Sequence, residues 1–142
     1  MPPRLLGFSP YVGSVENWIL VVEDDAETRD GMVDLLNDSG FRSRGAACVE
    51  DAFDLIVERR PSLVLSDINL GNHHGGELME MAMNILGPGA APFIFVTGLP
   101  EDQIPAFLST ATPVLRKPVP VDTLLSLAAK YCLATKAGHT FV

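Results

Sequence analysis

The sequence predicts an α/β fold, a parallel β-sheet with helices on both faces, and three observations lead to it. Short apolar runs rich in β-branched residues alternate with longer segments whose apolar residues recur every three or four positions. The short runs lack the in–out alternation of a half-exposed strand, which indicates strands buried on both faces. Strict alternation of strand and helix favours parallel strands joined by helical crossovers.

The first strand–helix unit begins at Trp18. Residues 18–22 form an unbroken apolar run that ends in the acidic residues 23–25, and we predict a buried strand there. Residues 28–36 place apolar side chains on one stripe of a helix. Ser39-Gly40 ends this helix, because glycine is favoured just beyond a helix C-terminus.

The second unit is more polar than the first. Residues 41–46 predict a strand near an edge of the sheet, and residues 49–57 form an amphipathic helix. The sequence Arg59-Arg60-Pro61 ends that helix, since the residue before a proline disfavours the helical conformation.

The third unit starts with an apolar strand at 63–66 that leads directly into Asp67. A loop rich in glycine, asparagine and histidine is expected from 69 to 76. The apolar spacing from 78 to 85 then predicts a helix that stops at Gly87-Pro88-Gly89.

The fourth strand is predicted at 93–96, before Thr97-Gly98. Residues 101–110 are compatible with a short helix, provided that Pro105 lies in its first turn.

The fifth unit consists of a strand at 114–116 and a helix whose apolar stripe runs from 121 to 128. Five such units predict a flavodoxin-like doubly wound sheet with strand order 2-1-3-4-5. We place this domain at 17–133. Residues 1–16 are interpreted as an N-terminal arm or linker, and 134–142 as a C-terminal tail.

Composition narrows the class of protein. The chain has 142 residues, enough for one domain, and its 10 basic and 18 acidic residues give a formal net charge of −8. This charge argues against nucleic-acid binding and against attachment to a membrane through basic residues. No apolar run approaches the roughly 18 residues of a membrane span. Cys48 and Cys132 are far apart and are interpreted as reduced thiols, so we expect a cytoplasmic protein.

Chemically useful residues follow four of the five predicted strands: Glu23-Asp24, Asp67, Thr97 and Lys117. Ligands of doubly wound sheets bind beyond the carboxyl ends of the strands. Converging carboxylates favour a hard cation, Mg²⁺ or Mn²⁺. A cation, an ammonium group and a hydroxyl would together receive a phosphoryl group, with Asp67 as the nucleophile that forms an aspartyl-phosphate.

Four segments in this order resemble the motifs of response-regulator receiver domains, which act in two-component and phosphorelay signalling. They are residues 19–24, 63–67, 95–98 and 115–118, and the resemblance covers about 17–133. It implies a phosphoprotein that uses Mg²⁺ and takes its phosphoryl group from a histidine kinase or a histidine phosphotransferase. It also implies a signalling module that phosphorylates and dephosphorylates itself, not a turnover enzyme.

The resemblance assigns a role to each matching position. Asp67 corresponds to the phosphoacceptor, Thr97 to the hydroxyl that moves toward the phosphoryl group, and Lys117 to the lysine that pairs with it. Pro118 corresponds to a proline that often follows a cis peptide bond. The implied metal ligands are Asp24, Asp67, the backbone carbonyl of Asn69 and, through water, Glu23.

Two positions depart from the family pattern. Gly71 stands where a proline is usual, so we expect a looser loop, with His73-His74 as an exposed pair, although Gly75 matches a family glycine. Val114 stands where an aromatic switch residue is frequent. The route by which phosphorylation is read out is therefore open.

Other readings remain at this stage. A degenerate receiver would act as a protein-binding module without phosphorylation. A haloacid-dehalogenase-like phosphatase would also use an aspartyl nucleophile, but its Asp-x-Asp pattern is absent from 23–27, where Asp25 is expected to start the helix. The residues outside the domain are too few for an output domain. We therefore expect output through protein contact, through onward phosphotransfer or in a parent chain such as a hybrid kinase.

Overall fold

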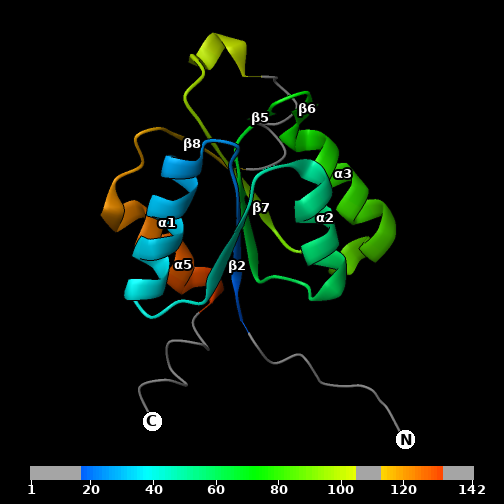
Figure 1. Ribbon diagram of the computed structural model, residues 1–142, viewed down its shortest axis with the longest axis horizontal. Coiled ribbons are helices and arrows are strands. Elements are labelled where there is room, and N and C mark those ends of the chain that lie inside the picture. The colour runs from blue at the N-terminus through cyan, green and yellow to red at the C-terminus, as the bar shows by residue number, and fades with distance from the viewer. Residues whose placement is uncertain (1–16, 105–112, 133–142) are drawn as a thin grey trace, which may run out of the picture.

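A five-stranded parallel sheet forms the centre of the computed structural model, which describes residues 17–104 and 113–132 (Figure 1). The strands are β2 Ile19–Val22, β3 Ser43–Ala46, β4 Leu63–Ser66, β7 Phe93–Thr97 and β8 Val114–Arg116. Their spatial order is β3-β2-β4-β7-β8, and every neighbouring pair is parallel. The predicted order 2-1-3-4-5 is confirmed.

Helices cover both faces of the sheet, as predicted. In Figure 1, α1 (Ala26–Asp38) and α5 (Val121–Tyr131) lie on one side, while α2 (Val49–Glu58) and α3 (Gly75–Leu86) lie on the other. Two separate apolar clusters fill the space between the sheet and these helix pairs.

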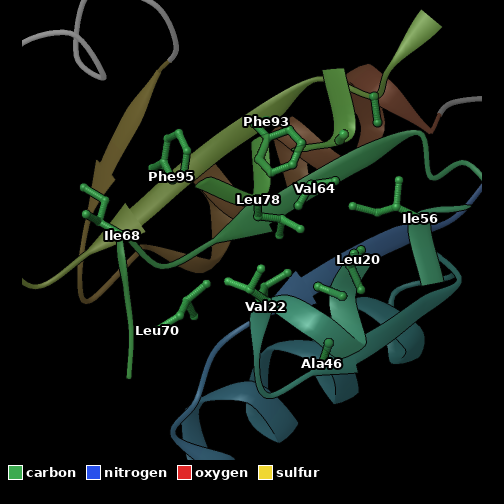
Figure 2. Close-up of a cluster of buried hydrophobic side chains, with 14 of the residues drawn as sticks. Leu20, Val22, Ala46, Ile56, Val64, Ile68, Leu70, Leu78, Phe93 and Phe95 are labelled. Atoms are coloured by element: carbon green, nitrogen blue, oxygen red, sulfur yellow. The ribbon is translucent and has the colours of Figure 1, made fainter. Parts of the chain in front are cut away.

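The strands supply both clusters because successive side chains of a strand point to opposite faces. On β2, Leu20 and Val22 belong to the cluster under α2 and α3, whereas Ile19 and Val21 belong to the cluster under α1 and α5. Figure 2 shows the first cluster, with Leu20 and Val22 among the labelled side chains. This two-sided burial explains why the strands appear in the sequence as unbroken apolar runs.

The start of α1 follows the prediction for Asp25. The Asp25 carboxylate accepts hydrogen bonds from the backbone N–H of Thr28 at 2.8 Å and from the Thr28 hydroxyl at 2.6 Å. These bonds hold the pKa of Asp25 below its usual value. Asp25 is therefore a structural helix cap beside the acidic residues that precede it.

The expectation of a loose loop after Asp67 is wrong. Residues 69–70 (β5) and 73–74 (β6) form a short antiparallel hairpin, and Gly71 turns the chain with a φ of 67°. His74 caps α3: its Nδ1 accepts from the N–H of Gly76 at 3.0 Å, and its own N–H donates to Glu77 at 3.3 Å. The reciprocal cap starts the helix at residue 75, before the first apolar residue of its stripe.

Part of the remaining prediction falls on residues that the structure does not describe. Short 3₁₀ turns occupy η1 Gly87–Gly89 and η2 Glu101–Gln103. The rest of the predicted helix at 101–110, the arm at 1–16 and the tail at 134–142 lie outside the described residues. Within 17–104 and 113–132, no helix has the length and apolarity to cross a membrane.

Candidate functional site

The candidate site lies beyond the carboxyl ends of β2, β4, β7 and β8. The register places the last residues of these strands side by side, because Val22 pairs with Ser66 and Thr97 pairs with Arg116. Glu23, Asp67 and Lys117 each follow one of these strand ends. Parallel pairing thus brings residues separated by up to 94 positions to one edge of the sheet.

Lys117 links two carboxylates across this edge. Its Nζ donates to Glu23 Oε1 at 2.5 Å and to Asp67 Oδ2 at 3.0 Å. The backbone N–H of Lys117 donates to the carbonyl of Thr97 at 2.8 Å, which extends the strand pairing by one residue. The Lys117–Pro118 peptide bond is cis, as the resemblance implied.

Glu23 is a buried carboxylate at the base of the site. Its Oε2 accepts from the N–H of Asp25 at 3.2 Å, and its carbonyl accepts from Arg29 Nη1 at 3.0 Å. Burial raises the pKa of Glu23, and the hydrogen bond from Lys117 only partly opposes that rise. The ammonium group is therefore the main local stabiliser of the charged form of Glu23.

Lys117 is held in its charged form by the same contacts. Partial burial by itself would lower the pKa of Lys117, but the hydrogen bonds to Glu23 and Asp67 outweigh that effect, and the pKa is raised. The site therefore presents a fixed positive charge next to Asp67 at neutral pH.

The acidic residues form a candidate cation site. Glu23, Asp24 and Asp67 each offer a carboxylate oxygen, and these three oxygens all lie within 4.8 Å of one another. Glu23 is buried, Asp67 is half-buried and Asp24 is exposed, so the cluster opens to solvent on the Asp24 side. A set of oxygen donors suits Mg²⁺ or Mn²⁺ better than a softer metal.

Backbone contacts hold Asp67 in place at the carboxyl end of β4. Its N–H donates to the carbonyl of Val22 at 3.0 Å, and its Oδ1 accepts from the N–H of Asn69 at 3.3 Å. The carbonyl of Asp67 accepts from the Ser66 hydroxyl at 2.9 Å. One carboxylate oxygen thus faces the hairpin and the other faces Lys117.

Thr97 lies on the same edge but is engaged elsewhere in this structure. Its side chain is buried, and its Oγ1 accepts a hydrogen bond from the N–H of Leu99 at 3.0 Å. The structure thus assembles Glu23, Asp24, Asp67 and Lys117, while the hydroxyl of Thr97 holds the loop after β7.

Gly75 lies directly against the backbone of Asp67, where a side chain would not fit. A Cβ atom there would collide with the carbonyl of Asp67 and would lie 2.8 Å from the ring of Phe95. The N–H of Gly75 donates to the carbonyl of Ile68 at 2.7 Å, which closes the segment after Asp67 onto the start of α3. The glycine noted from the sequence thus has a steric reason.

Sequence reasoning missed three supporting residues. Ser66 and Arg29 donate to backbone carbonyls of Asp67 and Glu23, and His74 caps α3. The sequence contained a signal for two of them, Ser66 and His74. Ser66 is a polar residue within an apolar strand, and Glu77 stands three positions after His74, which is the spacing of a capping box. The contact of Arg29 with the backbone carbonyl of Glu23, six positions earlier, had no such signal.

Comparison with known proteins gives a consistent result. A profile of the family described as "Response regulator receiver domain" matches residues 19–129. An uncharacterized 14.6 kDa protein of Leptolyngbya boryana is 33% identical over 118 residues, which are 82% of this chain and 90% of that protein. The sensory transduction protein LytT of Bacillus cereus is 30% identical over 115 residues. The match covers 80% of this chain but 46% of LytT, so the chain spans less than half of that relative.

Solved structures share the fold. A CheY-like response regulator receiver domain protein from Methanospirillum hungatei JF-1 has a TM-score of 0.72 and 28% identity, covering 87% of this chain and 98% of that one. The chemotaxis response regulator CheY4 of Vibrio cholerae has a TM-score of 0.71 at 22% identity, covers 82% of this chain and 99% of its own, and supports the fold alone.

Proposed function

This chain belongs to the response regulator receiver domain family, and from that premise we propose that it accepts a phosphoryl group on Asp67 and signals by a change of conformation. The observation that carries the proposal is the position of Lys117, whose Nζ lies between Asp67 and Glu23 within the acidic cluster. A carboxylate beside a fixed ammonium group is suited to receive a group that brings negative charge.

The proposed cation is Mg²⁺, with Mn²⁺ as a substitute. Asp24, Asp67 and the backbone carbonyl of Asn69 would hold it, and Glu23 would reach it through water. When bound, the cation would neutralise charge on the transferring phosphoryl oxygens. The oxygen-only donor set and the spacing of the three carboxylates support this assignment.

The proposed transfer is a displacement at phosphorus. A carboxylate oxygen of Asp67 attacks the phosphorus of a phosphohistidine, an O–P bond forms and the N–P bond breaks, and the electron pair stays on the imidazole of the donor. Lys117 then pairs with an oxygen of the bound phosphoryl group. Attack by water on the aspartyl-phosphate returns Asp67 and inorganic phosphate. We propose that this cycle serves signalling and not the turnover of a small substrate.

The proposed donor is a histidine kinase or a histidine phosphotransferase. A groove of about 470 Å³ adjoins Lys117, and α1 and the residues before α5 line it, including Met32, Leu35 and Val119. Its mainly apolar wall offers a contact surface for the donor protein beside the acceptor.

The proposed response starts at Thr97. In the unphosphorylated structure its hydroxyl accepts from the N–H of Leu99. A phosphoryl oxygen on Asp67 would compete for this hydroxyl, and the loop after β7 would rearrange. Val114 is half-buried and packs against the adjacent core, so the change would reach β8 without an aromatic switch. The rearranged surface would then meet a downstream protein.

Incubation with acetyl phosphate and Mg²⁺, followed by intact-mass measurement, tests the acceptor. We expect an adduct of about 80 Da, the mass of HPO₃, that is absent in Asp67→Asn and in the presence of EDTA. Absence of the adduct with both acetyl phosphate and a phosphorylated histidine kinase would favour a binding module that needs no phosphorylation. Release of phosphate from a small phosphate ester with multiple turnovers would favour the phosphatase alternative.

A further inference from the structure

We propose that a second site lies at the end of the sheet opposite to the acidic site formed by Glu23, Asp24 and Asp67. This second site binds a small ligand with a phosphate or carboxylate group. The site is a pocket of about 260 Å³ whose wall includes Trp18, Ser43, Glu58 and three arginines: Arg42, Arg44 and Arg59. We call it the arginine pocket. It does not depend on the proposed phosphorylation of Asp67.

Strand geometry explains why these arginines converge. The N–H of Ile19 donates to the carbonyl of Arg42 at 2.9 Å, and Leu20 pairs with Arg44. Ser43 faces α1, because its hydroxyl donates to the carbonyl of Val33 at 3.1 Å. Side chains alternate along a strand, so Arg44 leaves the opposite face, toward α2, as Leu20 does. The last residues of α2 close the pocket there.

The charge of the wall is positive in a chain whose formal net charge is −8. Its lining includes three arginines and one acidic residue, Glu58, and all four are exposed. The dipole of α2 places about half a negative charge at its C-terminus, and the last turn of α2 contains no basic residue that would offset it. One of the three arginines is needed to balance this charge. Positive charge remains in excess. Arg42 and Arg59 also have other partners, which a bound anion would share.

Trp18 is a buried residue of the pocket wall. The residue is 6% exposed, and its Nε1 has no hydrogen-bond partner among the described residues but is buried out of reach of a ligand in the pocket. An indole N–H and a guanidinium group can only donate hydrogen bonds. The Ser43 hydroxyl is already engaged with Val33 and Asn37. The arginines of the wall therefore offer donors, and an oxyanion supplies acceptors.

The size and position of the pocket define the ligand class. A volume of 260 Å³ is at the small end for ligand pockets and suits a small molecule. Guanidinium groups match phosphate and carboxylate oxygens through paired hydrogen bonds. Trp18 precedes β2 and Glu23 follows it, so about 16 Å of extended chain separates this pocket from the acidic site.

Fluorescence of Trp18 tests the site directly, because it is the sole tryptophan of the chain. The full chain is titrated with pyrophosphate and, separately, with citrate, in Mg²⁺-free buffer with ionic strength held constant by NaCl. We expect a saturable change in emission with at least one of the two anions. Saturation by pyrophosphate alone indicates a phosphate-bearing ligand, and saturation by citrate alone indicates a carboxylate-bearing one.

Arg44→Gln should weaken the apparent affinity at least about tenfold, since it removes a charged hydrogen-bonding partner. Arg116→Gln is the matched control, because Arg116 is exposed on β8, the other edge strand, and its loss should leave the affinity unchanged. Asp67→Asn should also bind normally, which separates this site from the phosphorylation site.

Two results would overturn the proposal. One is the absence of saturation by either anion up to about 10 mM. The other is an equal loss of affinity in Arg44→Gln and Arg116→Gln, which would indicate a general charge effect. If circular dichroism shows that Arg44→Gln is unfolded, Arg59→Gln replaces it with the same expected loss, and normal affinity in that variant would then contradict the site.

Discussion

Two ion clusters flank the segment after Asp67, and they differ in exposure. In the inner cluster the side chains of Glu23, Asp67 and Lys117 are 5%, 13% and 26% exposed. The outer cluster joins His73 to two carboxylates: Nε2 lies 3.1 Å from Glu50, and Nδ1 lies 3.0 Å from Glu77. Its side chains are 43%, 66% and 56% exposed, in the order His73, Glu50, Glu77.

The distances are similar, so the difference in surroundings decides what each cluster does. Exposed pairs are screened by water and contribute little to stability. Buried charges depend on their partners, since removal of one partner leaves the other uncompensated. We therefore expect the inner cluster to dominate both stability and chemistry, and the outer cluster to fasten the hairpin weakly to α2 and α3.

The largest expected effect is on cation binding. Asp24→Ala removes an exposed carboxylate from the inner cluster and should lower the affinity for Mg²⁺ by about 100-fold, near the upper range for loss of a group at a metal site. Isothermal titration with Mg²⁺ measures this change. Glu77→Gln, in the outer cluster, and Asp25→Ala, in the adjacent cap, should keep the wild-type affinity. An unchanged affinity in Asp24→Ala would refute the metal assignment.

Loss of Lys117 should have the next largest effect. Lys117→Ala leaves the carboxylates of Glu23 and Asp67 without their shared ammonium group. The free energy of unfolding should fall by about 2 kcal/mol, less than for a fully buried pair because the site is partly solvated. The domain should still fold, and its response to phosphorylation should be blunted.

Urea denaturation with and without Mg²⁺ sharpens this prediction. Added Mg²⁺ should recover part of the lost stability, because the cation restores positive charge between the same carboxylates. His73→Ala is the matched variant in the outer cluster and should be much less affected, with or without Mg²⁺. Equal destabilisation of the two variants would contradict the contrast between the clusters.

A third substitution tests the close packing of Gly75 against Asp67. Gly75→Ala forces a methyl group against the carbonyl of Asp67 and the ring of Phe95, and should destabilise the domain by roughly 1–3 kcal/mol. Gly31→Ala in α1 meets open space and should stabilise the domain by about 0.5–1 kcal/mol, since alanine favours the helix. Thermal melts of both variants measure whether each substitution lowers or raises the stability of the domain. If both substitutions changed the stability in the same direction, steric crowding would not explain the glycine at position 75.

The smallest effect is the pH dependence of the outer cluster. The hydrogen bond to Glu77, with the charge of Glu50, raises the pKa of His73, and the reciprocal bond lowers the pKa of Glu77. The histidine contribution is complete below its ordinary pKa of about 6.5 and is lost as pH rises through the raised value. The Glu77 contribution is lost only as pH falls below its ordinary range.

An NMR titration of His73 measures this effect. In Glu77→Gln the pKa of His73 should move down toward its ordinary value, and in Asp67→Asn it should stay at the wild-type value. A pKa of His73 that is unchanged in Glu77→Gln would show that the outer cluster does not form in solution.

The strands were predictable because their signal is local. Residues 19–22 and 63–65 are apolar without interruption, and only burial on both faces accounts for that pattern. The hairpin after Asp67 was not predictable in the same way. Each of its strands has two residues, too few for any periodicity, and it depends on the positive φ of Gly71 and on the cap by His74.

The candidate site likewise has one part that the sequence predicted and another part that it did not. Polar residues placed directly after strands predicted that Glu23, Asp67 and Lys117 would share one edge, since parallel strands end together. The preference of the Thr97 hydroxyl for the N–H of Leu99 depends on the turn that follows β7. The arginine pocket depends on which face of β3 carries Arg44. The sequence of that short strand, Ser-Arg-Gly-Ala, has no apolar–polar alternation that would predict the face.

The sequence by itself determined the order of the elements, the parallel sheet and the edge at which the acids and the lysine meet. These follow from periodicity and from strand ends, which are properties of neighbouring residues. Only the tertiary structure decided that Lys117 bridges Glu23 and Asp67, and that three arginines surround one pocket beside Trp18. Such contacts depend on register and on side-chain direction between elements distant in the chain, and these are fixed only when the whole core packs.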